Sequence, residues 1–258
     1  MLKASSLFST VLSLLALAST STAHAQKTPV KNIVLVHGAW VDASGWKPVY
    51  DILIKDGYSV SMVQEPLISY DGDVAAARRI IDMQSGPVVL VGHSYGGSVI
   101  SQAGNDPKVV SLVYVAAHMP DAGESEAADG KKFPSDLAKS MYVKSTPDKF
   151  NYLDPSAFPS YFAADLPKAQ AVFEAHSQIL TAIANFEGIV TKPAWRTKPS
   201  WMIVAGSDRV INPDLERWYA ARAKSHTTEL AGASHSVYES RPKEVAAVIE
   251  KAAQEASK

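Results

Sequence analysis

The sequence predicts an α/β protein with a doubly wound, mostly parallel sheet of about six strands and helices on both faces. Short runs of branched apolar residues alternate with stretches of helical periodicity along most of the chain. Several of these runs are apolar at every position, which is typical of strands buried on both faces of a parallel sheet. The alternation stops from about 118 to 199, where aromatic, Pro, Asp and Ser residues gather. We therefore expect one sheet with an insertion, which we interpret as a lid.

The first half of the chain supplies four of the expected strands and the helices between them. The helix that begins near Trp46 has Val49 and Leu53 on one face, at the spacing of a stripe that packs on a sheet. Gly57 follows that helix and is placed to end it in the left-handed conformation. The expected strands lie at about 33–36, 58–63, 88–91 and 109–115, and the expected helices at about 46–54, 73–84 and 98–105.

The second half of the chain returns to the same alternation after the insertion. Inside the insertion, one helix is expected at about 168–186. Strands follow at about 201–205 and 227–230, a helix opens at Pro213, and a closing helix follows Pro242. No repeat or linker marks off a second unit, so we expect one domain at 26–258 with its lid at about 118–199. The alternative for the insertion is a peripheral elaboration without substrate contact.

The N-terminal residues have the composition of a secretory signal peptide. Lys3 precedes an apolar stretch at 7–18, and Ala23-His24-Ala25 forms a cleavage pattern of small residues. The apolar stretch is shorter than the ~20 residues that a helix needs to span a bilayer. We therefore predict a signal peptide at 1–25 and a periplasmic or secreted protein with no stable membrane association after cleavage.

Composition excludes several classes of function. The chain has no cysteine, which rules out a thiol nucleophile and a Cys-ligated metal. Its net charge is −1 and it has no basic run, so we expect no nucleic-acid partner. No helical cluster of His and Glu ligands is present in the sequence, and we therefore expect no metal.

The stretch at 87–97 carries the main chemical signal. The apolar run at 88–91 leads directly into Gly92-His93-Ser94-Tyr95-Gly96, which fits the pattern G-x-S-x-G, and a helical segment follows. In a turn this tight between strand and helix, Ser94 takes a strained backbone conformation, and bulky residues at 92 and 96 would collide. Such an elbow holds the serine hydroxyl above the edge of the sheet, so Ser94 is the predicted nucleophile.

Two further residues follow strands at the same edge. Asp208 comes after the strand at 201–205, and His235 comes after the strand at 227–230. Ligands of open α/β sheets bind outside the carboxyl ends of the strands, where all these exit loops meet. A serine hydroxyl needs a base to take its proton, and the base needs a carboxylate to orient it. We therefore predict that Ser94, His235 and Asp208 form a catalytic triad.

Acyl chemistry also needs amide groups that face the developing oxyanion. The N–H of Tyr95 is one candidate, and Ala39, in the loop after the first strand, is the other. Trp40 follows Ala39, and His118 lies at the base of the lid. Trp40 and His118 are therefore predicted to contact the substrate. His176, within the lid, is a polar residue for which a solvated position is expected.

Other acids and histidines are less suited to the site. His226 precedes its strand, which puts it at the opposite edge of the sheet. Asp214 lies in a first helical turn, where an acid serves the helix dipole, and Asp121 at the base of the lid is the remaining rival of Asp208. His37 and His93 are expected to order loops by hydrogen bonds rather than to transfer protons.

Taken together, these residues resemble the α/β-hydrolase superfamily. The sequence of the first strand and of the loop after it is similar to that of the branch that contains plant methyl-ester hydrolases, hydroxynitrile lyases and small bacterial esterases. The motifs that carry the likeness are Val34-Leu35-Val36-His37-Gly38-Ala39-Trp40, Gly92-His93-Ser94-Tyr95-Gly96-Gly97, Gly206-Ser207-Asp208-Arg209 and Gly232-Ala233-Ser234-His235. The resemblance implies the α/β-hydrolase fold, a Ser94–Asp208–His235 triad with Ala39 and Tyr95 as oxyanion amides, and no cofactor.

The expected function is that of an exported serine hydrolase acting on a small-molecule carboxylic ester. The first alternative is a hydroxynitrile-lyase type of enzyme, or another cofactor-free enzyme of this fold, that uses the same triad as a base. No lysine in the lid matches a lyase's substrate lysine, since Lys192 and Lys198 lie in a Pro-rich approach to a strand. The second alternative is a non-catalytic binding protein on the same scaffold.

Overall fold

A computed structural model describes residues 1–2 and 30–256. The predicted signal peptide at 1–25 therefore lies, apart from its first two residues, outside the described residues. Within the described ranges, no helix is long and apolar enough to cross a membrane.

A single sheet of six parallel strands forms the centre of the molecule, in the order β2-β1-β3-β4-β8-β9. The prediction of a mostly parallel sheet with about six strands is confirmed. The order reverses between β1 and β3, because the chain adds strands on one side of β1 first and on the other side afterwards. Such a reversal leaves a crevice at the carboxyl ends of the two strands. The strands are β1 (Asn32–Val36), β2 (Ser59–Val63), β3 (Val88–Ser94), β4 (Val109–Ala117), β8 (Ser200–Ala205) and β9 (His226–Leu230).

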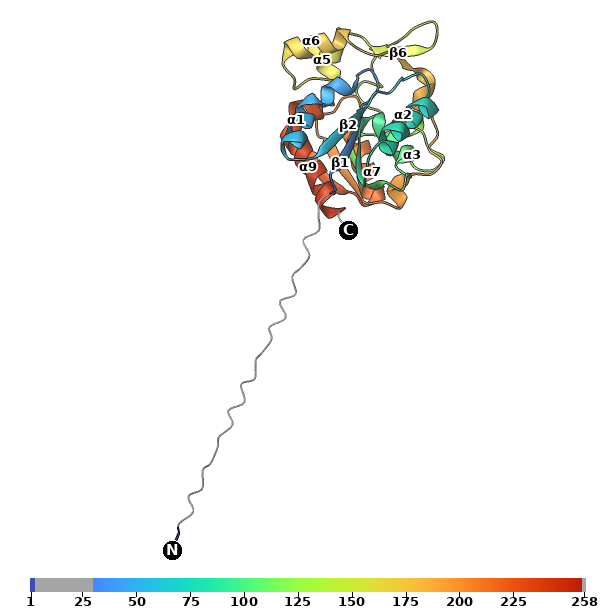
Figure 1. Cartoon of the computed structure of the whole chain (residues 1–258). Helices are drawn as coiled ribbons and strands as arrows, with labels where there is room; N and C mark the ends of the chain where they lie inside the picture. Colours follow the sequence, from blue (N-terminus) through green and yellow to red (C-terminus); the bar gives the residue numbers. More distant parts are fainter. Residues whose placement is uncertain (3–29, 257–258) are drawn as a thin grey trace.

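Helices cover both faces of the sheet (Figure 1). Alternate residues of β1 show the division: Ile33 and Leu35 join a buried cluster with α1 and α9, whereas Val34 and Val36 join a second cluster with α2, α3 and α7. A parallel strand buried on both sides explains why its sequence is apolar at every position. The helices are α1 (Lys47–Lys55), α2 (Tyr70–Asp82), α3 (Gly96–Ala103), α7 (Pro213–Ala223) and α9 (Pro242–Glu255).

The first helical region illustrates how the apolar stripe packs. A 3₁₀ turn, η1 (Ala43–Trp46), precedes α1, and Trp46, Val49 and Leu53 are fully buried against the sheet. Burying a side chain of this size contributes roughly 1.5–3 kcal/mol. Gly57 has φ 82°, so the chain leaves the helix through the expected left-handed conformation.

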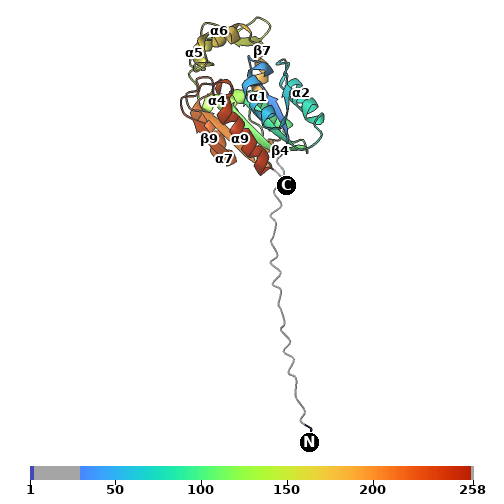
Figure 2. The ribbon, with the colours of Figure 1, turned by 60° about the vertical axis from the view of Figure 1, so that its left-hand side comes forward.

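The segment between β4 and β8 forms the insertion. Its three strands form a separate antiparallel sheet in the order β5-β6-β7. Figures 1 and 2 both show α5 and α6 stacked over one end of the sheet. The amide of Ile179 donates to Trp40, which follows β1, and the amide of Ser236, beyond β9, donates to Phe162, so this end carries the strand exits. The inserted elements are α4 (Glu126–Lys132), β5 (Val143–Ser145), β6 (Phe150–Leu153), α5 (Phe158–Tyr161), α6 (Lys168–His176), β7 (Thr181–Ala182), η2 (Ile183–Glu187) and η3 (Ala194–Arg196).

The helix expected at 168–186 is wrong in its second half. Helix α6 ends at His176, and Phe173 is 71% exposed. Beyond it, the side chain of Gln178 bonds both the amide and the carbonyl of Leu153, at 3.0 and 2.8 Å. The backbone amides of Ile179 and Ala182 then donate to the carbonyls of Trp40 and Leu67 rather than to carbonyls of a helix, a tertiary effect that local periodicity does not contain.

Candidate active site

The backbone at Ser94 has the strained conformation that the elbow motif predicts. Its φ is 53°, in the left-handed region that costs a non-glycine residue free energy. A Cβ atom at Gly92 would lie 2.6 Å from the carbonyl oxygen of Gly96, so the residues on either side of the turn must be small. The side chain of Ser94 is 6% exposed, at the mouth of the sheet crevice.

The structure brings Ser94, His235 and Asp208 together in one hydrogen-bonded line. His235 Nε2 lies 2.9 Å from Ser94 Oγ, and His235 Nδ1 lies 2.6 Å from Asp208 Oδ2. The other oxygen of Asp208 accepts from the amides of Val210 and Ile211, at 2.7 and 2.9 Å. Because a carboxylate accepts and does not donate, the His235 proton belongs on Nδ1, which leaves Nε2 free to accept from the serine.

Two buried side chains, those of His93 and Glu216, form hydrogen bonds with the backbone near these three residues. His93 Nε2 donates to the carbonyl oxygen of His235 at 2.9 Å, and burial lowers the pKa of His93 well below its usual value. Glu216 accepts from the amide of Ala205 at 3.1 Å, and burial, followed by the charge of Asp208, raises the pKa of its carboxyl well above the usual value. Burial thus favours the neutral form of both groups. His93 thus orders a loop, as its place in the elbow predicts, whereas no sequence pattern points to Glu216.

The loop after β1 is pressed against the serine. A Cβ atom at Gly38 would lie 2.6 Å from Ser94 Cβ, so only glycine allows this approach. His37 secures the loop: its Nε2 accepts from the amide of Glu65 at 2.9 Å, and its Nδ1 donates to the carbonyl of Gly38 at 2.8 Å. Burial lowers the pKa of His37, which keeps the ring neutral and able to accept. Ala39 is the next residue and lines the pocket around Ser94.

Tyr95 is anchored through its side chain. Its hydroxyl donates to Asp73 Oδ2 of α2 at 2.8 Å, and Asn185 of the insertion donates to the same oxygen at 2.6 Å. The other oxygen of Asp73 accepts from the amide of Leu67 at 2.9 Å. The residue after the serine is therefore tied both to helix α2 and to the insertion. Asp73 and Asn185 were not predicted as parts of the site, because a single Asp or Asn in a segment carries no pattern.

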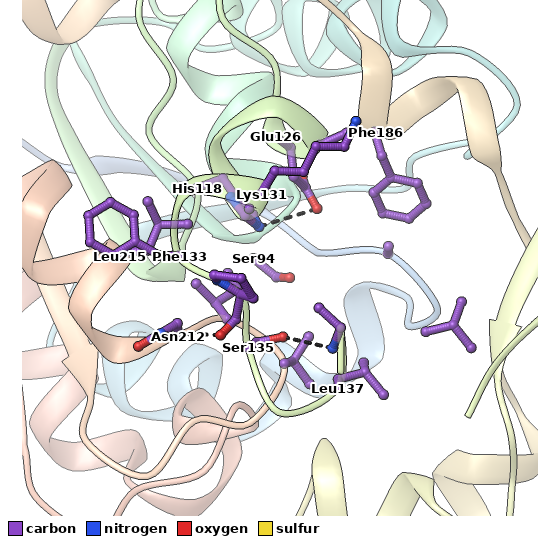
Figure 3. A pocket seen from close by; sticks show the side chains of 18 of the residues that line it. Ser94, His118, Glu126, Lys131, Phe133, Ser135, Leu137, Phe186, Asn212 and Leu215 are labelled. Carbon is purple, nitrogen blue, oxygen red and sulfur yellow. Dashed lines mark hydrogen bonds and ion pairs between the residues drawn. The ribbon is translucent and has the colours of Figure 1, made fainter. Parts of the chain in front are cut away.

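A pocket of about 470 Å³ opens above Ser94. Figure 3 shows Ser94 at its floor, with His118 and Glu126 close by and Phe133, Leu137, Phe186 and Leu215 among the surrounding side chains. Both residues predicted to contact substrate line the pocket: Trp40, whose Nε1 donates to Asn151 at 2.9 Å, and His118. The full lining is Ala39, Trp40, Ser94, His118, Glu126, Ala127, Gly130, Lys131, Phe133, Pro134, Ser135, Leu137, Ala138, Val143, Asn151, Phe186, Val210, Ile211, Asn212 and Leu215.

The rival residues lie elsewhere. Asp121 forms an ion pair with Arg196, and Asp214 pairs with Arg217. His226 is exposed and stacks on Trp201 at the far edge of the sheet. Lys198 donates to the backbone carbonyls of Asp106 and Val109, at 2.6 and 2.7 Å, so it does not face the pocket. Among the described residues, no group of His, Asp or Glu is arranged to hold a metal ion.

A parallel sheet with a serine elbow at the switch in strand order, and His and Asp side chains beside it, defines an α/β-hydrolase scaffold. The chain belongs to the alpha/beta hydrolase family, whose sequence pattern matches residues 33–248.

The similar proteins agree with this assignment. Methylesterase 2 of Arabidopsis thaliana is 26% identical over 218 residues, which cover 73% of this chain and 82% of that protein. A carbendazim hydrolyzing esterase of Nocardioides sp. is 35% identical over 109 residues, or 36% of this chain and 45% of that protein. The crystal structure of polyneuridine aldehyde esterase shares the fold, with a TM-score of 0.72 and 17% identity over 85% of this chain and 98% of its own. The predicted resemblance to the plant methylesterase branch is confirmed.

Proposed function

We propose that the protein is an exported serine hydrolase that cleaves small-molecule carboxylic esters through an acyl-enzyme on Ser94. The observation that carries the proposal is the line of hydrogen bonds from Ser94 through His235 to Asp208 at the floor of a pocket. Membership of the alpha/beta hydrolase family and the esterases among the similar proteins support a hydrolase.

The residues act as follows in this proposal. Ser94 Oγ attacks the ester carbonyl carbon while His235 Nε2 takes its proton, and Asp208 stabilises the imidazolium. The carbonyl oxygen becomes an oxyanion, which is stabilised by the amide of Ala39, in the loop after β1, and the amide of Tyr95, in the elbow. His235 then gives its proton to the leaving alcohol as the carbon–oxygen bond breaks, which leaves an acyl group on Ser94.

The second half of the cycle repeats the first with water. His235 takes a proton from water, whose oxygen attacks the acyl carbon, and the tetrahedral intermediate collapses to a carboxylic acid as Ser94 regains its proton. Every group involved is an amino-acid side chain or a backbone amide, so the scheme uses no cofactor or metal. Trp40 and His118 contact the substrate in the pocket, whose largely apolar wall suits an apolar or aromatic ester.

Hydrolysis of a graded series of nitrophenyl esters, from acetyl to decanoyl and benzoyl, tests the proposal on the chain from Gln26 to Lys258. We expect turnover by the unmodified protein, a fall with acyl size set by the pocket, and at least a ~10³-fold loss in Ser94→Ala. Equal inactivity of both proteins toward the whole series would overturn the ester-hydrolase assignment. Release of cyanide from a cyanohydrin would then identify the lyase alternative.

Export is a separate part of the proposal and rests on the sequence at 1–25. Expression of the full chain in a bacterial host, followed by fractionation and N-terminal sequencing, tests it. We expect a periplasmic or secreted protein that begins at Gln26. An uncleaved chain in the cytoplasmic fraction would refute the export assignment and leave the catalytic one untouched.

A further inference from the structure

A second polar cluster lies in the same pocket, apart from the Ser94–His235–Asp208 line. It consists of His118, directly after β4, and Glu126, the first residue of α4, with Tyr219 of α7 and Asp129 behind them. His118 and Glu126 both line the pocket, near Ser94 in Figure 3, in a wall where apolar side chains predominate. The triad chemistry described above does not use this cluster.

The hydrogen bonds fix where the protons lie. Asp129 pairs with Lys132 at 2.7 Å, so its carboxylate accepts, and the Tyr219 hydroxyl donates to it at 2.9 Å. The Tyr219 oxygen, 3.4 Å from His118 Nδ1, can then only accept, which puts the His118 proton on Nδ1. His118 Nε2 is left with a lone pair, 3.3 Å from Glu126 Oε1. A bond between these two atoms requires that Glu126 carries a proton.

Burial favours the same neutral arrangement. The side chains of His118 and Glu126 are 8% and 13% exposed. Burial lowers the pKa of His118 to about 3 and raises the pKa of Glu126 to about 8, so that both groups are uncharged near pH 7. The groups that face Glu126 from other elements add no cation: they are His118, Ser98, Glu65, Tyr70, Tyr95 and Tyr219.

The pair is incompletely satisfied. Its contacts, at 3.3 and 3.4 Å, are longer than ordinary hydrogen bonds, and Glu126 Oε2 has no hydrogen-bond partner in the described part of the chain. Ser98 lies near enough to affect the pKa of Glu126, but its hydroxyl is also without a partner among the described residues. Buried polar groups are nearly always hydrogen-bonded. A pair beside a pocket with long contacts and an unbonded oxygen therefore indicates a place where a group of a ligand binds.

We propose that His118 and Glu126 form a subsite for a hydroxyl group, and that the preferred substrates are apolar or aromatic esters that carry one hydroxyl. The inference rests on the proposed ester-hydrolase function and narrows its substrate class. The pair presents an acceptor, His118 Nε2, beside a donor, the acid proton of Glu126. A hydroxyl matches both because it donates and accepts. A methyl or methoxy group cannot donate, and an ammonium cannot accept.

A matched set of esters tests the subsite. The acyl half is probed with nitrophenyl phenylacetates that carry hydroxyl, methyl or methoxy at the ortho, meta or para position. The alcohol half is probed with benzyl acetates substituted in the same way. For at least one position we expect kcat/KM to favour hydroxyl over methyl by about tenfold or more, with methoxy no better than methyl. A ratio below about threefold at every position in both sets would overturn the proposal.

Variants separate recognition from folding, because a structural defect lowers turnover of the hydroxyl and methyl esters alike. Glu126→Gln keeps a donor and should retain the hydroxyl preference, whereas Glu126→Leu and His118→Phe should each bring the ratio close to one. Lys131→Met, which removes an exposed ammonium from the same pocket, is the matched control and should keep the preference. Persistence of the preference in both Glu126→Leu and His118→Phe, or its loss in Lys131→Met, would refute the assignment. Turnover of the methyl esters that depends on Ser94 shows that the hydrolase proposal stands even where the subsite proposal fails.

Discussion

A Cβ atom at Gly38 would lie 2.6 Å from Ser94 Cβ, so the loop after β1 and the elbow after β3 are in direct contact. They meet where the strand order of the sheet reverses, which is the crevice where ligands of such sheets bind. His37, through its bond to the Gly38 carbonyl, keeps this loop in place. The amide proposed to stabilise the oxyanion, that of Ala39, is therefore positioned by backbone contact rather than by its own side chain.

Gly38→Ala should displace that loop. We expect kcat for a nitrophenyl ester to fall by about 10²-fold or more, since removal of one oxyanion donor has an effect of that order, with a smaller change in KM. Gly86→Ala is the control, because its added Cβ meets only Asn32 Nδ2, at an ordinary 3.4 Å. An unchanged kcat in Gly38→Ala would show that the loop does not stabilise the transition state.

Asp73 accepts from three donors that come from separate parts of the chain: Tyr95, Asn185 and the amide of Leu67. Asp73→Ala leaves the Tyr95 hydroxyl and the Leu67 amide buried without this acceptor, and Asn185 keeps only its 3.2 Å bond to Tyr95. We expect a loss of about 3 kcal/mol in the free energy of unfolding in urea. Asp82→Ala, at an exposed end of the same helix, should change it by less than about 0.5 kcal/mol. Equal effects of the two substitutions would contradict a structural role for the Asp73 network.

Asp208→Asn keeps the size of the side chain but reverses the hydrogen bond to His235. An amide nitrogen at this position would donate to Nδ1 and force the imidazole proton onto Nε2, where it faces Ser94. We expect kcat to fall by about 10⁴-fold, as in other triads with this change, while KM stays within a few-fold. Retention of more than about a tenth of kcat would exclude Asp208 as the partner of the base.

The burial of Glu126 makes stability depend on pH. Its pKa is raised by burial from 4.5 to about 8, so in this window the folded chain holds a proton that the unfolded chain has lost. Stability from this group is fully present below about pH 4.5 and is lost as pH rises to about 8. Glu126→Gln does not titrate, so the wild type should lose stability relative to the variant by up to about 1.4 kcal/mol per pH unit. Urea unfolding of both proteins across this range measures the difference, and a difference independent of pH would contradict the raised pKa.

The parts that sequence predicted well depend on local patterns. The four inner strands of the central sheet, β1, β3, β4 and β8, consist mainly of apolar residues, and the elbow is a contiguous motif that contains Ser94. The rule that strand exits share one edge was enough to choose His235 over His226, and it placed Asp208 at the same edge while Asp121 remained a rival. The structure brings Asp208 and His235 to Ser94 and pairs Asp121 with Arg196. The left-handed conformation of Gly57 was likewise predictable, because a helix commonly ends at a glycine with positive φ.

The parts that sequence missed depend on contacts between distant segments. Helix α6 ends at His176, and beyond it the amides of Ile179 and Ala182 pair with Trp40 and Leu67, which are distant in the sequence. In the sequence, Glu126 and Asp73 are indistinguishable from the acidic residues that are common in the first turn of a surface helix. Only the packed chain shows that Asp73 is buried and that Glu126, with its side chain 13% exposed, lines the pocket.

Labelling with a fluorophosphonate, which forms a covalent adduct with an activated serine, tests the role of Ser94 most directly. We predict one adduct per chain, located by mass spectrometry on the peptide that contains Ser94, with esterase activity lost in proportion to labelling. Neither Ser94→Ala nor the unfolded protein should react. An adduct on another residue, or full activity after stoichiometric labelling of Ser94, would contradict the account.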